Sequence, residues 1–98
     1  MAKSAPKSTA VRLPDVMDLK AAAPLRDQLL AARGQPIKLD ASHVQRIGGL
    51  CLQVLLSARQ SWDEDKLPLQ IVDPSPEFTD GIALFGAAAL IDNSGANL

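Results

Sequence analysis

The sequence predicts an α/β fold, with three helices packed on a mixed, mainly parallel β-sheet of about four strands. Short segments that alternate apolar and polar residues take turns with longer segments whose apolar residues recur every three or four positions. This alternation of strands and helices favours parallel strands joined by right-handed crossovers. A chain of 98 residues holds one domain. We place it at residues 10–90, between a tail at 1–9 and a second tail at 91–98.

The first strand is expected at residues 11–13, where apolar and charged residues alternate before Pro14. A helix follows, with its apolar face formed by Ala22, Leu25, Leu29 and Ala32. Proline costs about 3 kcal/mol inside a helix, so Pro24 predicts a start near residues 21–23, with Asp18 in the entering turn. Gly34 suits the left-handed conformation that follows a helix end.

The second strand is expected at residues 36–40, and residues 41–49 are expected to form a loop that ends in two glycines. A long helix should then run from Leu50 to Asp65. Its buried stripe comprises Cys51, Val54, Leu55, Ala58 and Trp62. We therefore expect Trp62 to be substantially buried.

The third strand is expected at residues 67–72, followed by a turn in which Ser75 is a suitable N-cap and Pro76 a suitable first helical residue. Phe78, Ile82 and Phe85 give the last helix its apolar face. Gly86 is expected to end this helix. On this pattern Phe85 should also be substantially buried.

The balance of charge gives no reason to expect a nucleic-acid partner or an anionic membrane surface. The formal net charge is −1, and acidic and basic residues are interspersed. No apolar run approaches the ~20 residues that span a bilayer, and no apolar signal core follows the N-terminal lysines. Cys51 is the single cysteine, so no internal disulfide can form. The expected location is the cytoplasm.

The sequence predicts neither a metal site nor a cofactor. One histidine and one cysteine cannot supply a zinc site without carboxylates, and no ligand spacing suggests one. No phosphate-binding loop or dinucleotide fingerprint is present. The pair Gly48-Gly49 could expose backbone amides to an anion, but no Lys, Ser or Thr follows to strengthen that signal.

A nucleophilic pair of Cys51 and His43 is conceivable. Cys51, however, lies on the buried helix stripe, which favours inert packing, and His43 is expected to be an exposed loop residue. We therefore expect that the protein is not an enzyme.

Residues 39–56, LDASHVQRIGGLCLQVLL, resemble the signature of STAS domains, the fold of anti-sigma-factor antagonists. The positions that match are Asp40, Val44, Ile47, Leu52 and Leu55, together with Asp18 before the first helix and Ser75-Pro76 before the last. The resemblance covers residues 10–90. The short N-terminal arm looks most like the minimal STAS subgroup, which includes a subunit of bacterial lipid-transport ABC systems. The resemblance implies a STAS-like sandwich that binds other proteins.

The chain departs from the family pattern at the phosphorylation site. Phosphorylatable members carry Asp-Ser-Ser-Gly and are modified on the second serine, whereas this chain has Gly48, Gly49, Leu50 and Cys51. Leu50 thus stands at the acceptor position, where a phosphate switch cannot operate. Other serines could be modified, namely Ser42, Ser57 or Ser75, but their spacing favours none of them.

Leu50 is also the centre of the predicted docking surface. On the long helix it shares a side with polar residues, so a large apolar side chain is expected to be at least partly exposed there. An apolar residue ringed by polar groups resembles an interface centre, and STAS partners contact this loop and helix start. The predicted partner-binding residues are Arg46, Gly48, Gly49, Leu50 and Gln53. The alternative is that Leu50 folds back as an N-terminal staple.

Two functions follow from the resemblance. The first is a non-catalytic, phosphorylation-independent interaction module in bacterial signalling, either in partner switching or as a chemotaxis or sensory-pathway scaffold, with a signalling kinase or regulator as its partner. The alternative is an accessory subunit that binds the ATPase of a lipid-transport ABC complex. A small enzyme or ligand carrier is disfavoured by the missing catalytic motifs.

Overall fold

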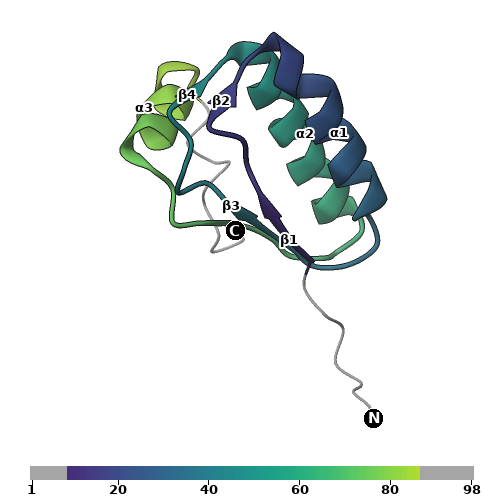
Figure 1. Ribbon diagram of the computed structural model, residues 1–98. Coiled ribbons are helices and arrows are strands. Elements are labelled where there is room, and N and C mark those ends of the chain that lie inside the picture. Colours follow the sequence, from purple (N-terminus) through teal and green to yellow (C-terminus); the bar gives the residue numbers. More distant parts are fainter. Residues whose placement is uncertain (1–8, 87–98) are drawn as a thin grey trace.

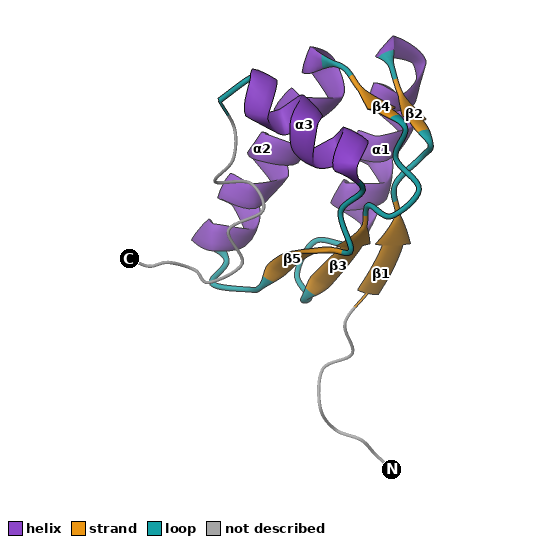
Figure 2. Cartoon of the chain, turned by 90° about the vertical axis from the view of Figure 1, so that its left-hand side faces the viewer, coloured by secondary structure: helices purple, strands orange, loops and turns teal. Residues whose placement is uncertain are grey.

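The computed structural model describes residues 9–86 (Figures 1 and 2). The predicted C-terminal tail at 91–98, and all of the predicted N-terminal tail except Thr9, lie outside this range. The elements in chain order are β1 (Thr9–Arg12), β2 (Val16–Met17), α1 (Leu19–Ala31), β3 (Ile37–Asp40), β4 (Arg46–Ile47), α2 (Gly49–Glu64), β5 (Leu69–Val72) and α3 (Pro76–Leu84).

The main sheet has the order β1-β3-β5, and α1 and α2 lie side by side over one of its faces (Figures 1 and 2). Each strand alternates buried and exposed residues. Val11, Leu39 and Ile71 pair across the sheet and point into the core. Lys38 and Gln70 are also paired, and both are exposed on the opposite face. The predicted α/β class is confirmed, with each sheet pairing between described residues parallel.

A second sheet, in which β2 pairs with β4, was not predicted. β4 lies within residues 41–49, which the sequence pattern indicated as loop, so that expectation was wrong. The described strands therefore divide into three and two, instead of one sheet of about four. Each strand of the small sheet has two residues, which is too short to show the alternation that identifies a strand.

Helix α1 begins at Leu19, earlier than Pro24 led us to expect. The Asp18 carboxylate accepts hydrogen bonds from the backbone N–H groups of Lys20 and Ala21, at 3.1 and 3.2 Å, and so caps the helix. Pro24 lies inside the helix on its exposed face, where water can replace the missing backbone hydrogen bond. Gly34 has a φ of +96°, the left-handed conformation that was predicted for it.

Helix α2 buries the predicted stripe against the sheet and α1, except that Val54 is only half-buried. Trp62 is 2% exposed, which confirms its predicted burial. Its indole N–H donates to the carbonyl of Gln35 at 2.8 Å, so the one polar atom of this buried ring is satisfied.

Helix α3 is capped as predicted, with the Ser75 hydroxyl accepting from the N–H of Phe78 at 3.0 Å. Phe78 and Ile82 fill the core. The expectation for Phe85 was wrong, since this side chain is 54% exposed. The helix ends at Leu84, so Phe85 lies beyond its last turn and no longer on its buried face.

Close packing at Gly81 holds α3 against β4. A Cβ atom at this position would overlap the Cγ2 atom of Ile47, which is nearly buried. Ile47 is β-branched and cannot easily turn aside. The absence of a side chain at Gly81 therefore sets how closely α3 approaches the small sheet.

Gly81→Ala tests this packing. In an open helix position the change would stabilise the protein, because alanine has the higher helix propensity. Here we expect overpacking to destabilise the fold by about 1–3 kcal/mol and to lower Tm by several degrees, measured by circular dichroism. Asp80→Ala, at the neighbouring exposed position, should stay within ~0.5 kcal/mol of the wild type. A Tm for Gly81→Ala at or above the wild-type value would contradict this account.

Candidate docking surface

The chain enters α2 through two glycines, which have no side chains. Gly48 is the N-cap and makes no side-chain capping bond, and Gly49 is the first helical residue. Leu50 follows and is 50% exposed, which agrees with the prediction of a partly exposed side chain and does not fit an N-terminal staple packed onto its neighbours.

Several hydrogen bonds fix this helix start beside the start of α1. The N–H of Gly48 donates to the carbonyl of Met17 at 2.9 Å, which continues the β2–β4 pairing to the edge of the helix. The N–H of Gln45 donates to the carbonyl of Asp15 at 2.6 Å. Both helices therefore begin at the same end of the small sheet.

Leu50 is part of a larger apolar surface that joins α2 to the end of α3. Gly49, Leu50, Leu52, Gln53, Leu56 and Phe85 line a shallow depression, which we call the apolar patch. Leu50, Leu56 and Phe85 are its exposed large apolar residues. A Cβ atom at Gly49 would lie 3.7 Å from Cε1 of Phe85, so the ring packs beside the bare backbone of this glycine.

The structure brings together three of the five residues predicted to bind a partner. Gly49, Leu50 and Gln53 line the apolar patch, whereas Gly48 and Arg46 do not. Gly48 is half-buried at the N-cap, and Arg46 is exposed on β4.

Sequence reasoning missed Leu56 and Phe85. Leu52 and Leu56 lie four residues apart beside the core stripe, and this widened apolar arc was a signal for Leu56. Phe85 carried no comparable signal, because its exposure depends on where α3 ends.

A tight turn after β3 leads the chain towards this surface. The hydroxyl of Ser42 donates to the Asp40 carboxylate at 2.6 Å, and the N–H of Ser42 donates to the same oxygen at 2.9 Å. These two hydrogen bonds hold the pKa of Asp40 below its usual value, the hydroxyl having the larger effect. Asp40, which matches the resemblance noted above, thus shapes the turn that leads into β4.

The other two serines considered as phosphorylation sites differ in access. The hydroxyl of Ser75 is buried, donates to the carbonyl of Val44 at 2.6 Å and caps α3, so a phosphate there would disrupt the fold. Ser57 is exposed on α2. Of the three serines, Ser42 lies in the exposed turn that leads into β4.

Cys51 lies beneath the surface, where its chemistry disfavours a nucleophilic role. Its side chain is fully buried, and the thiol donates to the carbonyl of Asp18 at 3.2 Å. Burial raises the pKa of the thiol, and the nearby Asp18 carboxylate raises it further. Because the thiolate is the nucleophilic form, this environment suppresses reactivity. His43 is exposed in the turn after β3.

Within residues 9–86, no group of three or more His, Cys, Asp or Glu side chains is placed to hold a metal ion. No helix in the same range is long and apolar enough to cross a membrane.

A family model described as Mlab, STAS domain matches residues 1–92, which includes both α2 and α3. No curated protein matches the chain.

Ser42→Ala tests the turn at Asp40. The change removes the hydroxyl donor and leaves the backbone N–H, so the pKa of Asp40 should rise part of the way to its ordinary value of about 3.9. Carbon-detected NMR of the Asp40 carboxyl across an acid titration measures this. Because the folded-state pKa is lowered, the turn stabilises the fold above the unfolded pKa, and this contribution is lost as the pH falls through the folded value. Ser57→Ala serves as the control, and an unchanged Asp40 pKa in Ser42→Ala would rule the hydroxyl out as its cause.

Proposed function

This chain belongs to the STAS domain family, and we propose that it is a non-catalytic docking module that binds a protein partner through the apolar patch. STAS domains are generally binding modules that mediate protein–protein interactions. The observation that carries the proposal is the half-exposed Leu50 at a helix start whose backbone is bare.

The composition of this surface suits an interface centre. Leu50, Leu56 and Phe85 expose apolar area within one depression, and Gln53 supplies a polar group in its lining. Interface centres are depleted in charge and enriched in aromatic residues, and their rims are polar. Burying the exposed halves of Leu50 and Phe85 contributes on the order of 1 kcal/mol each.

We propose further that docking does not depend on phosphorylation at the family acceptor position. Leu50 has no hydroxyl, and it occupies the second position of α2. An apolar side chain there makes the surface permanently able to bind, whereas a serine would allow a phosphate to change its charge.

The proposed partner belongs to a bacterial signalling pathway: a kinase or regulator of a partner-switching, chemotaxis or sensory system. The alternative is the ATPase of a lipid-transport ABC complex. The resemblance to the minimal STAS subgroup supports this alternative, as does the description of the matching family model, which names Mlab. Both kinds of partner are reached from the cytoplasm, where we propose the protein acts.

Leu50→Asp tests the docking surface. A carboxylate buried without a partner costs several kcal/mol, so binding should weaken by two or more orders of magnitude. In the free protein the carboxylate lies near a helix N-terminus, which favours it by ~0.3–1 kcal/mol, so Tm should be retained. Affinity capture from the native cell, comparing wild type with Leu50→Asp, should identify a partner that only the wild type retains.

Glu64→Lys, at the far end of α2, is the matched control and should bind normally. If Leu50→Asp retains the partner, the docking site lies elsewhere. If the variant unfolds, Leu50 supports the core instead. A captured kinase or regulator would support the signalling role, and a captured transporter ATPase would support the alternative.

The absence of a phosphate switch is tested separately. After incubation with the kinase of a partner-switching system, mass spectrometry should find residues 46–53 unmodified, since they contain no hydroxyl side chain. Stoichiometric phosphate on Ser42 would show that the acceptor had moved to the neighbouring turn and that docking is regulated after all.

A further inference from the structure

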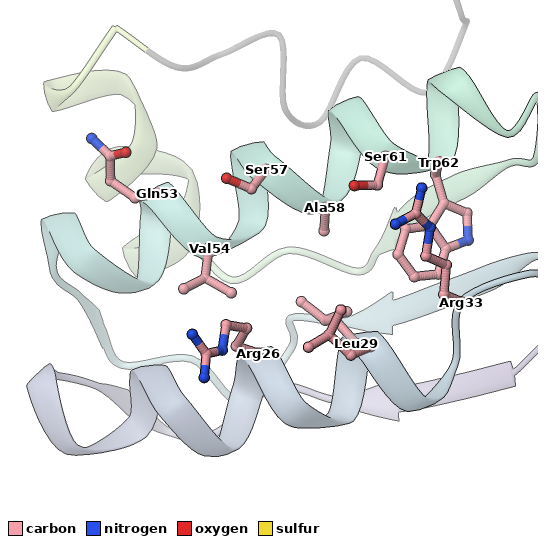
Figure 3. A pocket seen from close by; sticks show the side chains of 10 residues that line it. Arg26, Leu29, Arg33, Gln53, Val54, Ser57, Ala58, Ser61 and Trp62 are labelled. Carbon is pink, nitrogen blue, oxygen red and sulfur yellow. The ribbon is translucent and has the colours of Figure 1, made fainter.

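A second surface lies between α1 and α2, and the docking role proposed above does not account for it. It is a groove of about 290 Å³, open to solvent, that follows the two helices (Figure 3). The groove is lined by Arg26, Leu29 and Leu30 from α1, by Arg33 from the turn after α1, and by Gln53, Val54, Ser57, Ala58, Ser61 and Trp62 from α2.

The floor of the groove is apolar. Leu29, Ala58 and Trp62 are buried beneath it, and the half-buried Val54 lies above them. Leu30 lies on the α1 side of the groove and is 58% exposed, whereas the next residue in the chain, Leu29, is buried in the core. A side chain of a partner protein could therefore contact apolar surface on two sides, the exposed Leu30 and the floor of the groove.

The charged side chains that line the groove are both positive. Among the residues that line it, Arg26 and Arg33 are the only charged ones. Both side chains lie in the space between the helices, Arg26 extending from α1 and Arg33 from the turn that follows it (Figure 3). They are seven positions apart along the chain, with Arg33 in the turn just after α1, so their spacing is close to two helical turns, or roughly 10 Å.

Both guanidinium groups can exchange their present partners. Arg26 lies 4.0 Å from Asp27, its neighbour on the same helix, and both side chains are largely exposed. Arg33 donates to the Asp65 carboxylate at 3.0 Å, with both side chains partly exposed. Exposed ion pairs of this kind contribute little to stability, so an incoming carboxylate can replace them at small cost.

We propose that this groove binds an amphipathic helix of a partner protein that carries two carboxylates about two turns apart beside its apolar face. The lining residues on α2 extend from Gln53 to Trp62, about 13 Å along the helix axis, enough for two to three turns of a third helix. The apolar residues of that helix cover Leu30 and Val54, and its carboxylates accept charge-assisted hydrogen bonds from Arg26 and Arg33.

The openness of the groove favours a helix over a small molecule. Sites for small ligands enclose most of the ligand surface, whereas this groove leaves one side of any occupant in solvent. The groove also adjoins the apolar patch at Gln53, which lines both. One partner can therefore occupy both surfaces, although the groove proposal stands without the patch.

Two synthetic helical peptides with the same apolar face test the proposal against the full chain. One carries glutamates at two positions seven residues apart, and the other carries lysines there. We expect the glutamate peptide to bind at least tenfold more tightly. The fluorescence of Trp62, the single tryptophan, should change on binding. In ¹⁵N-HSQC spectra the amides of α1 and α2 that face the groove should shift, and those around Phe85 should not.

Variants assign the binding to the groove. Arg26 is exposed, so Arg26→Glu should preserve Tm. This variant should weaken binding of the glutamate peptide at least tenfold. Leu50→Asp should leave it unchanged, which separates this result from the fate of the apolar patch. The proposal is overturned if neither peptide binds at millimolar concentration, if both bind equally, if the shifts map to the patch, or if Arg26→Glu has no effect. Saturation of the groove by decanoate when neither peptide binds would assign it to small amphiphiles instead.

Discussion

The two-residue pairing of β2 with β4 is the constraint on which the functional surface depends. In a parallel α/β fold each helix follows a strand. With β1 and β3 alone, α1 and α2 would begin on separate connecting segments that no backbone pairing holds together. The ladder joins Val16–Met17 to Arg46–Ile47, and the N–H of Gly48 extends it by one further bond to Met17. It therefore brings the N-termini of α1 and α2 together, and the thiol of Cys51 adds a contact to the carbonyl of Asp18.

The same ladder also positions the third helix. Gly81 allows α3 to approach Ile47 closely, and α3 then ends so that Phe85 lies beside Gly49. Ile47 occupies the position that a side chain at Gly81 would need, and the Phe85 ring packs beside the backbone of Gly49. The apolar patch thus results from two chain segments that meet only because α3 is held on β4.

The sequence was sufficient for the parts of the fold that repeat a pattern. The alternation in β3 and β5, the stripe of α2 and the cap at Ser75 are local signals, and each was found in the structure. The exposure of Leu50 was also predicted, because helical periodicity places this residue on the same side of the helix as polar residues. The features that failed depend on distant contacts or on where a helix begins and ends. The start of α1 was decided by the cap at Asp18, with Pro24 tolerated on the exposed face. The small sheet depends on pairing between segments distant in sequence, and the exposure of Phe85 depends on where α3 ends.

The two surfaces that lie along α2 differ in chemistry. The apolar patch at its start has no charged lining residue, whereas the groove beside α1 has two arginines. A partner that uses the patch should protect the first turns of α2 and the end of α3 from solvent. The most direct measurement is hydrogen–deuterium exchange of the full chain with and without its captured partner. The account predicts slower exchange in residues 49–56 and 84–86. Protection confined to the exposed face of the main sheet, around Lys38 and Gln70, would contradict it.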